Sequence, residues 1–231
     1  FFRRDSVVTQ TRRVCRFVGQ QGWSGIKQML AQRAHAPAAE HSVSLQGLDV
    51  SPLPSLERHE QRPLSSIDTA KYTYFFFDVF DTAIIRLFEK PVDLFKHIGH
   101  SNRAPTFESL RIRQEHTARE KHSGRRDVKL AEIYRDFVGA DLDAEIAAEL
   151  TFCAAHPETL AFYADLVSMG KKIYFVSDMY LDRETVAAIL HKNGFNQYED
   201  IFVSSEDDLI KGDGSRFAWL KTSLPGSVGN A

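Results

Sequence analysis

The chain has 231 residues, a formal net charge of −2 and 43% hydrophobic residues, which supply enough apolar surface for a packed core. The near-neutral balance gives no reason to expect nucleic acid or an acidic membrane surface as a partner. No apolar run approaches the length of a membrane span, so we expect none. Cys15 and Cys153 are far apart and favour free thiols, which predicts a cytoplasmic location.

Residues 1–66 carry little that predicts a compact fold. In residues 1–33, apolar positions among basic ones predict short amphipathic helices broken near Gly19 and Gly22. We interpret this part as the tail of an upstream region, with a membrane-surface helix as the alternative. Residues 34–66 contain several prolines and scattered charges, which are typical of a partly extended linker. The remaining residues, 67–231, are expected to form one domain.

An aromatic stretch from Tyr72 to Phe77 ends abruptly in polar residues, Asp78, Asp81 and Thr82. A continuous apolar run without alternation is typical of a parallel strand that is covered on both faces. Ligands of such sheets bind beyond the carboxyl ends of the strands. The sequence therefore predicts that these polar side chains line a binding crevice.

Helical patterns fill most of the chain between residues 88 and 168. Pro91 is tolerated in the first turn of a helix, and Thr106 is a suitable cap for the next one. Apolar periodicity predicts helices over residues 92–98, 107–121, 129–138, 141–154 and 157–169. The pattern indicates a helical insertion between two strands.

The next apolar segment, residues 171–176, repeats the layout of the first, because Ser177 and Asp178 follow it. A helix over 183–193 ends at Asn193-Gly194, and a third strand follows at 200–203. Lys211 lies shortly beyond this strand and is expected at the same rim. The order of elements predicts an α/β fold with a Rossmann-like parallel sheet flanked by helices.

Three motifs in this order resemble those of the haloacid dehalogenase-like (HAD) hydrolase superfamily. They are Phe-Asp-Val-Phe-Asp-Thr at 77–82, Ser-Asp-Met-Tyr-Leu at 177–181, and Lys211 downstream. With Pro-x-Asp-Leu-Phe at 91–95, the chain is similar to a subgroup of predicted hydrolases, some of them attached to glycosyltransferases. The resemblance covers about residues 71–219 and implies a helical cap, at about 88–168, inserted after the first strand.

The resemblance also implies a chemistry, the hydrolysis of a small phosphorylated metabolite through an aspartyl-phosphate on Asp78. It implies Mg²⁺, bound by Asp78 and the backbone carbonyl of Phe80. Ser177 and Lys211 match the hydroxyl and the cation that hold the phosphoryl oxygens in this family. We therefore expect catalytic roles for Asp78, Asp81, Thr82, Ser177 and Lys211, and substrate contacts from Ser177, Asp178, Lys211 and Arg111.

The predicted helix over residues 107–121 carries arginines at nearly one-turn spacing. Guanidinium groups suit phosphate, so Arg111, Arg113 and Arg119 are candidates for contact with an anionic substrate. The alternative is a solvated helix face on which Glu108, Glu115 and Glu120 pair with these arginines.

Two departures from the family pattern keep other functions open. Phe80 stands where most phosphatases of the family have a second aspartate, and Asp81 follows where glycine is usual. The fourth motif is either degenerate at Ser227-Val228-Gly229-Asn230 or lies beyond the end of this sequence. The alternatives are a catalytically impaired module that binds or regulates beside a glycosyltransferase, and a metal-independent dehalogenase-like enzyme.

Overall fold

The structure is a computed structural model that describes residues 16–18 and 64–223. The rest of the predicted N-terminal tail, the linker up to residue 63 and residues 227–230, the candidate for a degenerate fourth motif, lie outside the described residues. Arg16–Val18 form strand β1, where helices were predicted, so that prediction is wrong for these three residues. Two short 3₁₀ turns, η1 (Leu64–Ser66) and η2 (Thr69–Lys71), precede the second strand.

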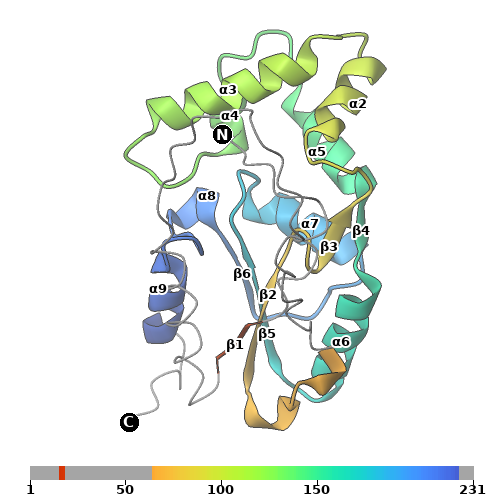
Figure 1. Cartoon of the computed structure of the whole chain (residues 1–231), viewed down its shortest axis with the longest axis vertical. Helices are drawn as coiled ribbons and strands as arrows, with labels where there is room; N and C mark the ends of the chain where they lie inside the picture. The colour runs from red at the N-terminus through yellow and green to blue at the C-terminus, as the bar shows by residue number, and fades with distance from the viewer. Residues whose placement is uncertain (1–15, 19–63, 224–231) are drawn as a thin grey trace, which may run out of the picture.

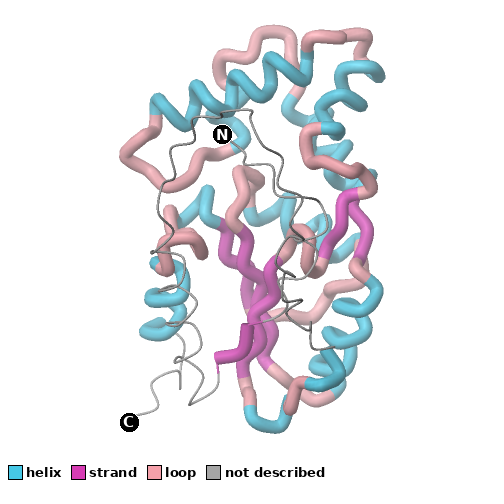
Figure 2. Tube along the Cα trace, in the orientation of Figure 1, coloured by secondary structure: helices cyan, strands magenta, loops and turns pink. Residues whose placement is uncertain are grey.

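The main sheet has the order β1-β2-β5-β6 (Figures 1 and 2). Strands β2 (Tyr74–Asp78), β5 (Lys172–Ser177) and β6 (Asp200–Val203) are parallel, and β1 pairs antiparallel with β2. All three parallel strands lie where the sequence predicts them. The register sets Asp78 opposite Val176 and Ser177 opposite Val203, so the polar residues that end each strand share one edge.

The alternating side chains of these strands are buried on both faces of the sheet. On one face, Phe75, Phe77 and Phe175 pack against helices α6 (Pro157–Ser168) and α7 (Arg183–Lys192). On the other face, Phe76 and Tyr174 pack against helix α9 (Ser215–Ser223). Cover on both sides explains why the strand sequences are apolar without alternation. The prediction of a mixed α/β fold with a parallel sheet flanked by helices is confirmed.

Four of the helices that lie between β2 and β5 along the chain form a group, which we call the helical segment. It consists of α2 (Asp93–Ser101), α3 (Phe107–Lys121), α4 (Leu130–Tyr134) and α5 (Leu142–Phe152). The segment has a small core of its own, made of Leu94, Phe95, Ile98, Phe107, Phe137 and Ala148. Figure 1 shows it at the end of the sheet where α8 (Ser204–Asp207) follows β6, over the carboxyl ends of the parallel strands.

Some helix boundaries differ from the predictions for physical reasons. Helix α3 has the predicted bounds, but the Thr106 side chain makes no capping hydrogen bond. Helix α4 ends at Tyr134, whereas the predicted helix covers residues 129–138. Helix α5 ends at Phe152 because β4 (Cys153–Ala155) pairs antiparallel with β3 (Ile84–Arg86), with Ile84 opposite Ala155. This two-stranded ribbon carries the chain into and out of the helical segment.

Candidate functional site

The centre of the site is an ion pair between Asp78, at the end of β2, and Lys211, in the loop that follows α8. The Lys211 Nζ donates a hydrogen bond to Asp78 Oδ1, and it lies 3.4 Å from the carbonyl oxygen of Val176. Both charged side chains are about a quarter exposed, with 24% for Asp78 and 23% for Lys211. The predicted approach of Lys211 to the strand ends is thus confirmed, and the pair is open to a ligand from solvent.

Lys211 also joins the loop after β5 to this pair. Its backbone N–H donates to both carboxylate oxygens of Asp178, at 3.2 and 3.0 Å. Although the Asp178 side chain is exposed, the protein around it removes enough water to raise its pKa, an effect that Lys211 partly opposes. Asp178 therefore positions the backbone of Lys211, whose ammonium group contacts the other acid.

One hydroxyl group contacts the ion pair, and a second lies at the end of the neighbouring strand. The Thr82 Oγ1 donates to Asp78 Oδ2 at 3.4 Å, and the Thr82 side chain is buried. Ser177 is only 1% exposed, at the end of β5, and no hydrogen bond to its side chain is found among the described residues. The Asp78 carboxylate, the Thr82 hydroxyl and the Lys211 ammonium group form an arrangement at this edge of the sheet that can hold an anion beside a nucleophile.

The residues after Asp78 form a tight turn rather than the start of a helix. Hydrogen bonds run from Ala83 N to Val79 O, 2.9 Å, and from Asp81 N to Ile84 O, 2.7 Å. Asp81 has φ of 59°, in the left-handed region where glycine is favoured and aspartate is tolerated. Desolvation raises the pKa of Asp81, Arg86 opposes this shift, and Asp78 adds to it.

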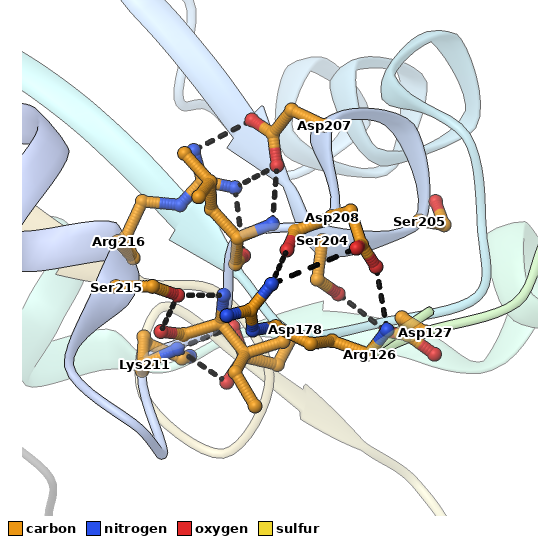
Figure 3. A network of polar contacts seen from close by, with 12 residues as sticks. Arg126, Asp127, Asp178, Ser204, Ser205, Asp207, Asp208, Lys211, Ser215 and Arg216 are labelled. Atoms are coloured by element: carbon orange, nitrogen blue, oxygen red, sulfur yellow. Dashed lines mark hydrogen bonds and ion pairs between the residues drawn. The ribbon is translucent and has the colours of Figure 1, made fainter. Parts of the chain in front are cut away.

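The loop around Lys211 is held by a network of polar contacts (Figure 3). The buried Asp127 accepts hydrogen bonds from Ser204 Oγ and, at 2.9 Å, from Val128 N. Ser204 Oγ in turn accepts from Met179 N at 2.9 Å. This chain of contacts ties the helical segment to the end of β6 and to the loop after β5.

Three aspartates near Lys211 have structural partners. Asp207 binds the buried Arg216, and Asp208 accepts from Arg126 N at 2.6 Å. Asp213 accepts from Ser215 N at 2.8 Å and from Arg126 Nε at 2.6 Å. Turn-forming and ion-pairing roles account for these carboxylates.

Arg111 matches the two predictions for this helix only in part. Its side chain is fully buried, and its guanidinium group donates to Glu145 through Nε at 2.6 Å and through Nη2 at 2.8 Å. A third nitrogen, Nη1, contacts Glu115 at 3.1 Å. The predicted pairing with Glu115 is confirmed for Arg111, and Arg119 shares the same partner, but the predicted solvation is wrong for Arg111. The predicted substrate contact is not supported, because the hydrogen-bonding groups of Arg111 point to glutamates of the helical segment.

The metal prediction can be compared with the ligands that the structure offers. No group of three or more histidine, cysteine or acidic side chains that could hold a metal ion occurs within residues 64–223. Asp78 and the Phe80 carbonyl would supply two oxygen ligands, and Asp78 already binds Lys211. The described residues alone therefore do not complete a magnesium site.

Comparisons with other proteins add no family assignment. Neither the models of known protein families nor the curated proteins include a match to this chain. Within the described ranges, no helix is both long and apolar enough to cross a membrane.

Several residues around the site were not singled out by sequence reasoning. Among them are Glu149, which forms an ion pair with Arg86 beside Phe80, and the buried Asp127. A signal for Glu145 and Glu149 existed, because they are spaced one turn apart in a helix that is otherwise mostly apolar. Charged residues at such positions are buried only when they are paired.

Proposed function

We propose that the chain is a hydrolase of the HAD-like superfamily that acts on a small phosphorylated metabolite, with Asp78 as the nucleophile. The observation that carries this proposal is the Lys211–Asp78 ion pair at the carboxyl ends of β2 and β5. An ammonium group here offsets the repulsion between the attacking carboxylate and the phosphoryl oxygens. The resemblance further suggests a sugar phosphate as substrate and a glycosyltransferase, attached or separate, as partner.

The proposed reaction uses side chains from this edge of the sheet. An Asp78 carboxylate oxygen bonds to phosphorus while the bond from phosphorus to the leaving oxygen breaks. Lys211 and the hydroxyls of Ser177 and Thr82 hold the phosphoryl oxygens. Asp81, the other carboxylate of the same turn, is assigned to supply a proton to the leaving group. The oxygen of a water molecule then bonds to phosphorus while the bond from phosphorus to Asp78 breaks, and Asp81 takes up the proton of the water. Inorganic phosphate leaves, and both acids return to their starting states.

Two features of the fold support the resemblance. The positive φ of Asp81 fits a position where the family usually has glycine. The helical segment lies between β3 and β4, over the carboxyl ends of the strands, as the inserted cap of the family would. Mg²⁺, with Asp78 and the Phe80 carbonyl as ligands, and a cytoplasmic location remain part of the proposal.

A second candidate is a module of the same fold that binds a phosphorylated ligand without turning it over. Phe80 at the usual position of the second acid favours it, as does the lack of a three-ligand group among the described residues. In this case Lys211 and Ser177 would bind the ligand, and Asp78 would only position Lys211.

Phosphate release from a panel of sugar phosphates and other phosphorylated metabolites, with Mg²⁺ and with a chelator, separates these functions. The hydrolase predicts Mg²⁺-dependent release that Asp78→Asn abolishes and that Asp165→Asn, a change of an exposed aspartate on α6, leaves intact. Binding of a panel member without release would favour the second candidate. Release that is unaffected by Asp78→Asn would contradict the assigned nucleophile, and metal-independent activity would favour the dehalogenase-like alternative.

A further inference from the structure

Each acid-bearing loop at the edge of the sheet has an aromatic residue two positions after its acid. Phe80 follows Asp78 by two residues, and Tyr180 follows Asp178 by two. An arginine guanidinium lies over each ring, with the Arg86 carbon 4.0 Å from the centroid of Phe80 and that of Arg111 4.8 Å from the centroid of Tyr180. Cation–π contact of this kind fixes a ring against a charged group.

Both arginines are held by glutamates of one helix. Arg86 donates to Glu149 through Nε at 3.1 Å and through Nη2 at 3.0 Å, and the two side chains are 9% and 1% exposed. Arg111 makes a bidentate contact with Glu145, in which both side chains are fully buried. Glu145 and Glu149 are one turn apart on α5. One face of this helix therefore holds both arginines and, through them, contacts the aromatic rings of both acid-bearing loops.

Neighbouring polar groups restrain both glutamates. Tyr134 Oη donates to Glu145 at 2.7 Å, and Cys153 Sγ lies 3.4 Å from Glu149. The backbone of the second loop is tied to the helical segment as well, because Leu130 N donates to the Tyr180 carbonyl at 2.8 Å. Bidentate arginine–carboxylate pairs are directional, so each guanidinium group is held in one orientation. The aromatic ring that packs against it is thereby held in one position.

We propose that Glu149 with Arg86, and Glu145 with Arg111, are positioning residues through which α5 sets the two acid-bearing loops. None of these four side chains needs to touch the substrate. Their effect passes through Phe80 to the turn that carries Asp78, and through Tyr180 to the loop that carries Asp178. The proposal assigns to the helical segment a direct part in the geometry of the reacting groups, and its kinetic consequence rests on the proposed hydrolase.

The Arg86–Glu149 pair is the better one to test, because it has fewer additional partners. Three variants are compared with the unchanged chain: Glu149→Gln, the double variant Arg86→Met with Glu149→Leu, and the control Glu158→Gln. Glu158 is an exposed glutamate of α6. The double variant replaces a buried ion pair by apolar side chains of similar size, which commonly preserves stability. It therefore separates positioning from a purely structural role.

For the best substrate of the panel, we expect Glu149→Gln to lower kcat by about 10- to 100-fold, because small displacements of reacting groups cost rates of this order. KM should stay within about threefold, since the lost effect acts on the transition state. The double variant should regain the thermal stability of the unchanged chain but keep the low kcat. Recovery of kcat together with stability, or a rise in KM alone, would overturn the proposal.

A second measurement remains decisive if the unchanged chain releases no phosphate, a result that would count against the proposed hydrolase only. Amide hydrogen exchange at residues 79–83 should be faster in Glu149→Gln and in the double variant than in the unchanged chain. Exchange in β5 should be the same in all of them, and Glu158→Gln should match the unchanged chain throughout. Equal exchange at 79–83 in every variant would show that the ion pair does not position this turn.

Discussion

Arg111 and Arg126 both come from the part of the chain between α2 and α5, and each contacts two acidic residues. Arg111 is fully buried between Glu145 and Glu115, whereas Arg126 is 46% exposed beside Asp208 and Asp213. Water screens the second set of contacts and is excluded from the first. The same residue type thus fixes the interior of the helical segment in one place and only fastens its surface to the Lys211 loop in the other.

The largest effect should come from removing the buried arginine. Arg111→Met leaves the Glu145 carboxylate in the interior without its ion-pair partner, which costs about 3–5 kcal/mol of unfolding free energy in comparable cases. Urea denaturation measures this loss. The matched control is Arg113→Met, on the exposed side of the same helix, which should change stability by less than about 0.5 kcal/mol. Similar losses of unfolding free energy in both variants would mean that the buried ion pair of Arg111 does not stabilise the fold more than an exposed arginine does.

A much smaller loss is expected at the exposed arginine. Arg126→Ala should lower the unfolding free energy far less than Arg111→Met does, because solvated ion pairs contribute little to stability. Because mobile ions screen exposed charges, the difference from the unchanged chain should shrink further at high salt. Denaturation at low and high salt checks both points. A loss as large as that of Arg111→Met, or one that salt does not reduce, would contradict the contrast between the two arginines.

The smallest effect concerns the protonation of a single exposed group. Partial desolvation alone would raise the pKa of Asp213, but hydrogen bonds from Ser215 and the nearby Arg126 lower it to about 2. A lowered pKa means that the contribution to stability is present above the ordinary value of 3.8 and is lost as the pH falls through about 2.

An NMR titration of the Asp213 carboxyl group measures this pKa directly. In Arg126→Ala, the pKa should rise toward the ordinary value, while the bonds from Ser215 keep it from reaching that value. An unchanged pKa in this variant would show that Arg126 has no electrostatic effect on Asp213.

The sheet and its polar edge could be predicted because the signal for them is local. An apolar run ending in an acid marks β2, and a similar run ending in Ser177 and Asp178 marks β5. The contact between Lys211 and Asp78 joins residues 133 positions apart. No local pattern contains such a contact, and it was indicated only by the order of the strands, which places Lys211 at the same rim, and by the resemblance to a family.

Other features depend on packing that a sequence pattern does not contain. Arg111 was predicted to contact substrate because guanidinium suits phosphate, but its burial is decided by Glu145, 34 residues away. Cys153-Ala154-Ala155 continues a helical composition and still forms β4, because pairing with β3 outweighs local preference. In both cases, the deciding partner comes from a distant part of the chain.

The central claim is that Asp78 becomes covalently phosphorylated during turnover. The most direct test is to mix the chain with an active sugar phosphate and Mg²⁺, quench in acid, and search the peptides by mass spectrometry for a phosphorylated aspartate. The account predicts that the phosphoryl group is found on Asp78 and is absent from Asp78→Asn. Turnover with no phosphoryl group on Asp78 at any quench time, or a phosphoryl group on another residue, would contradict it.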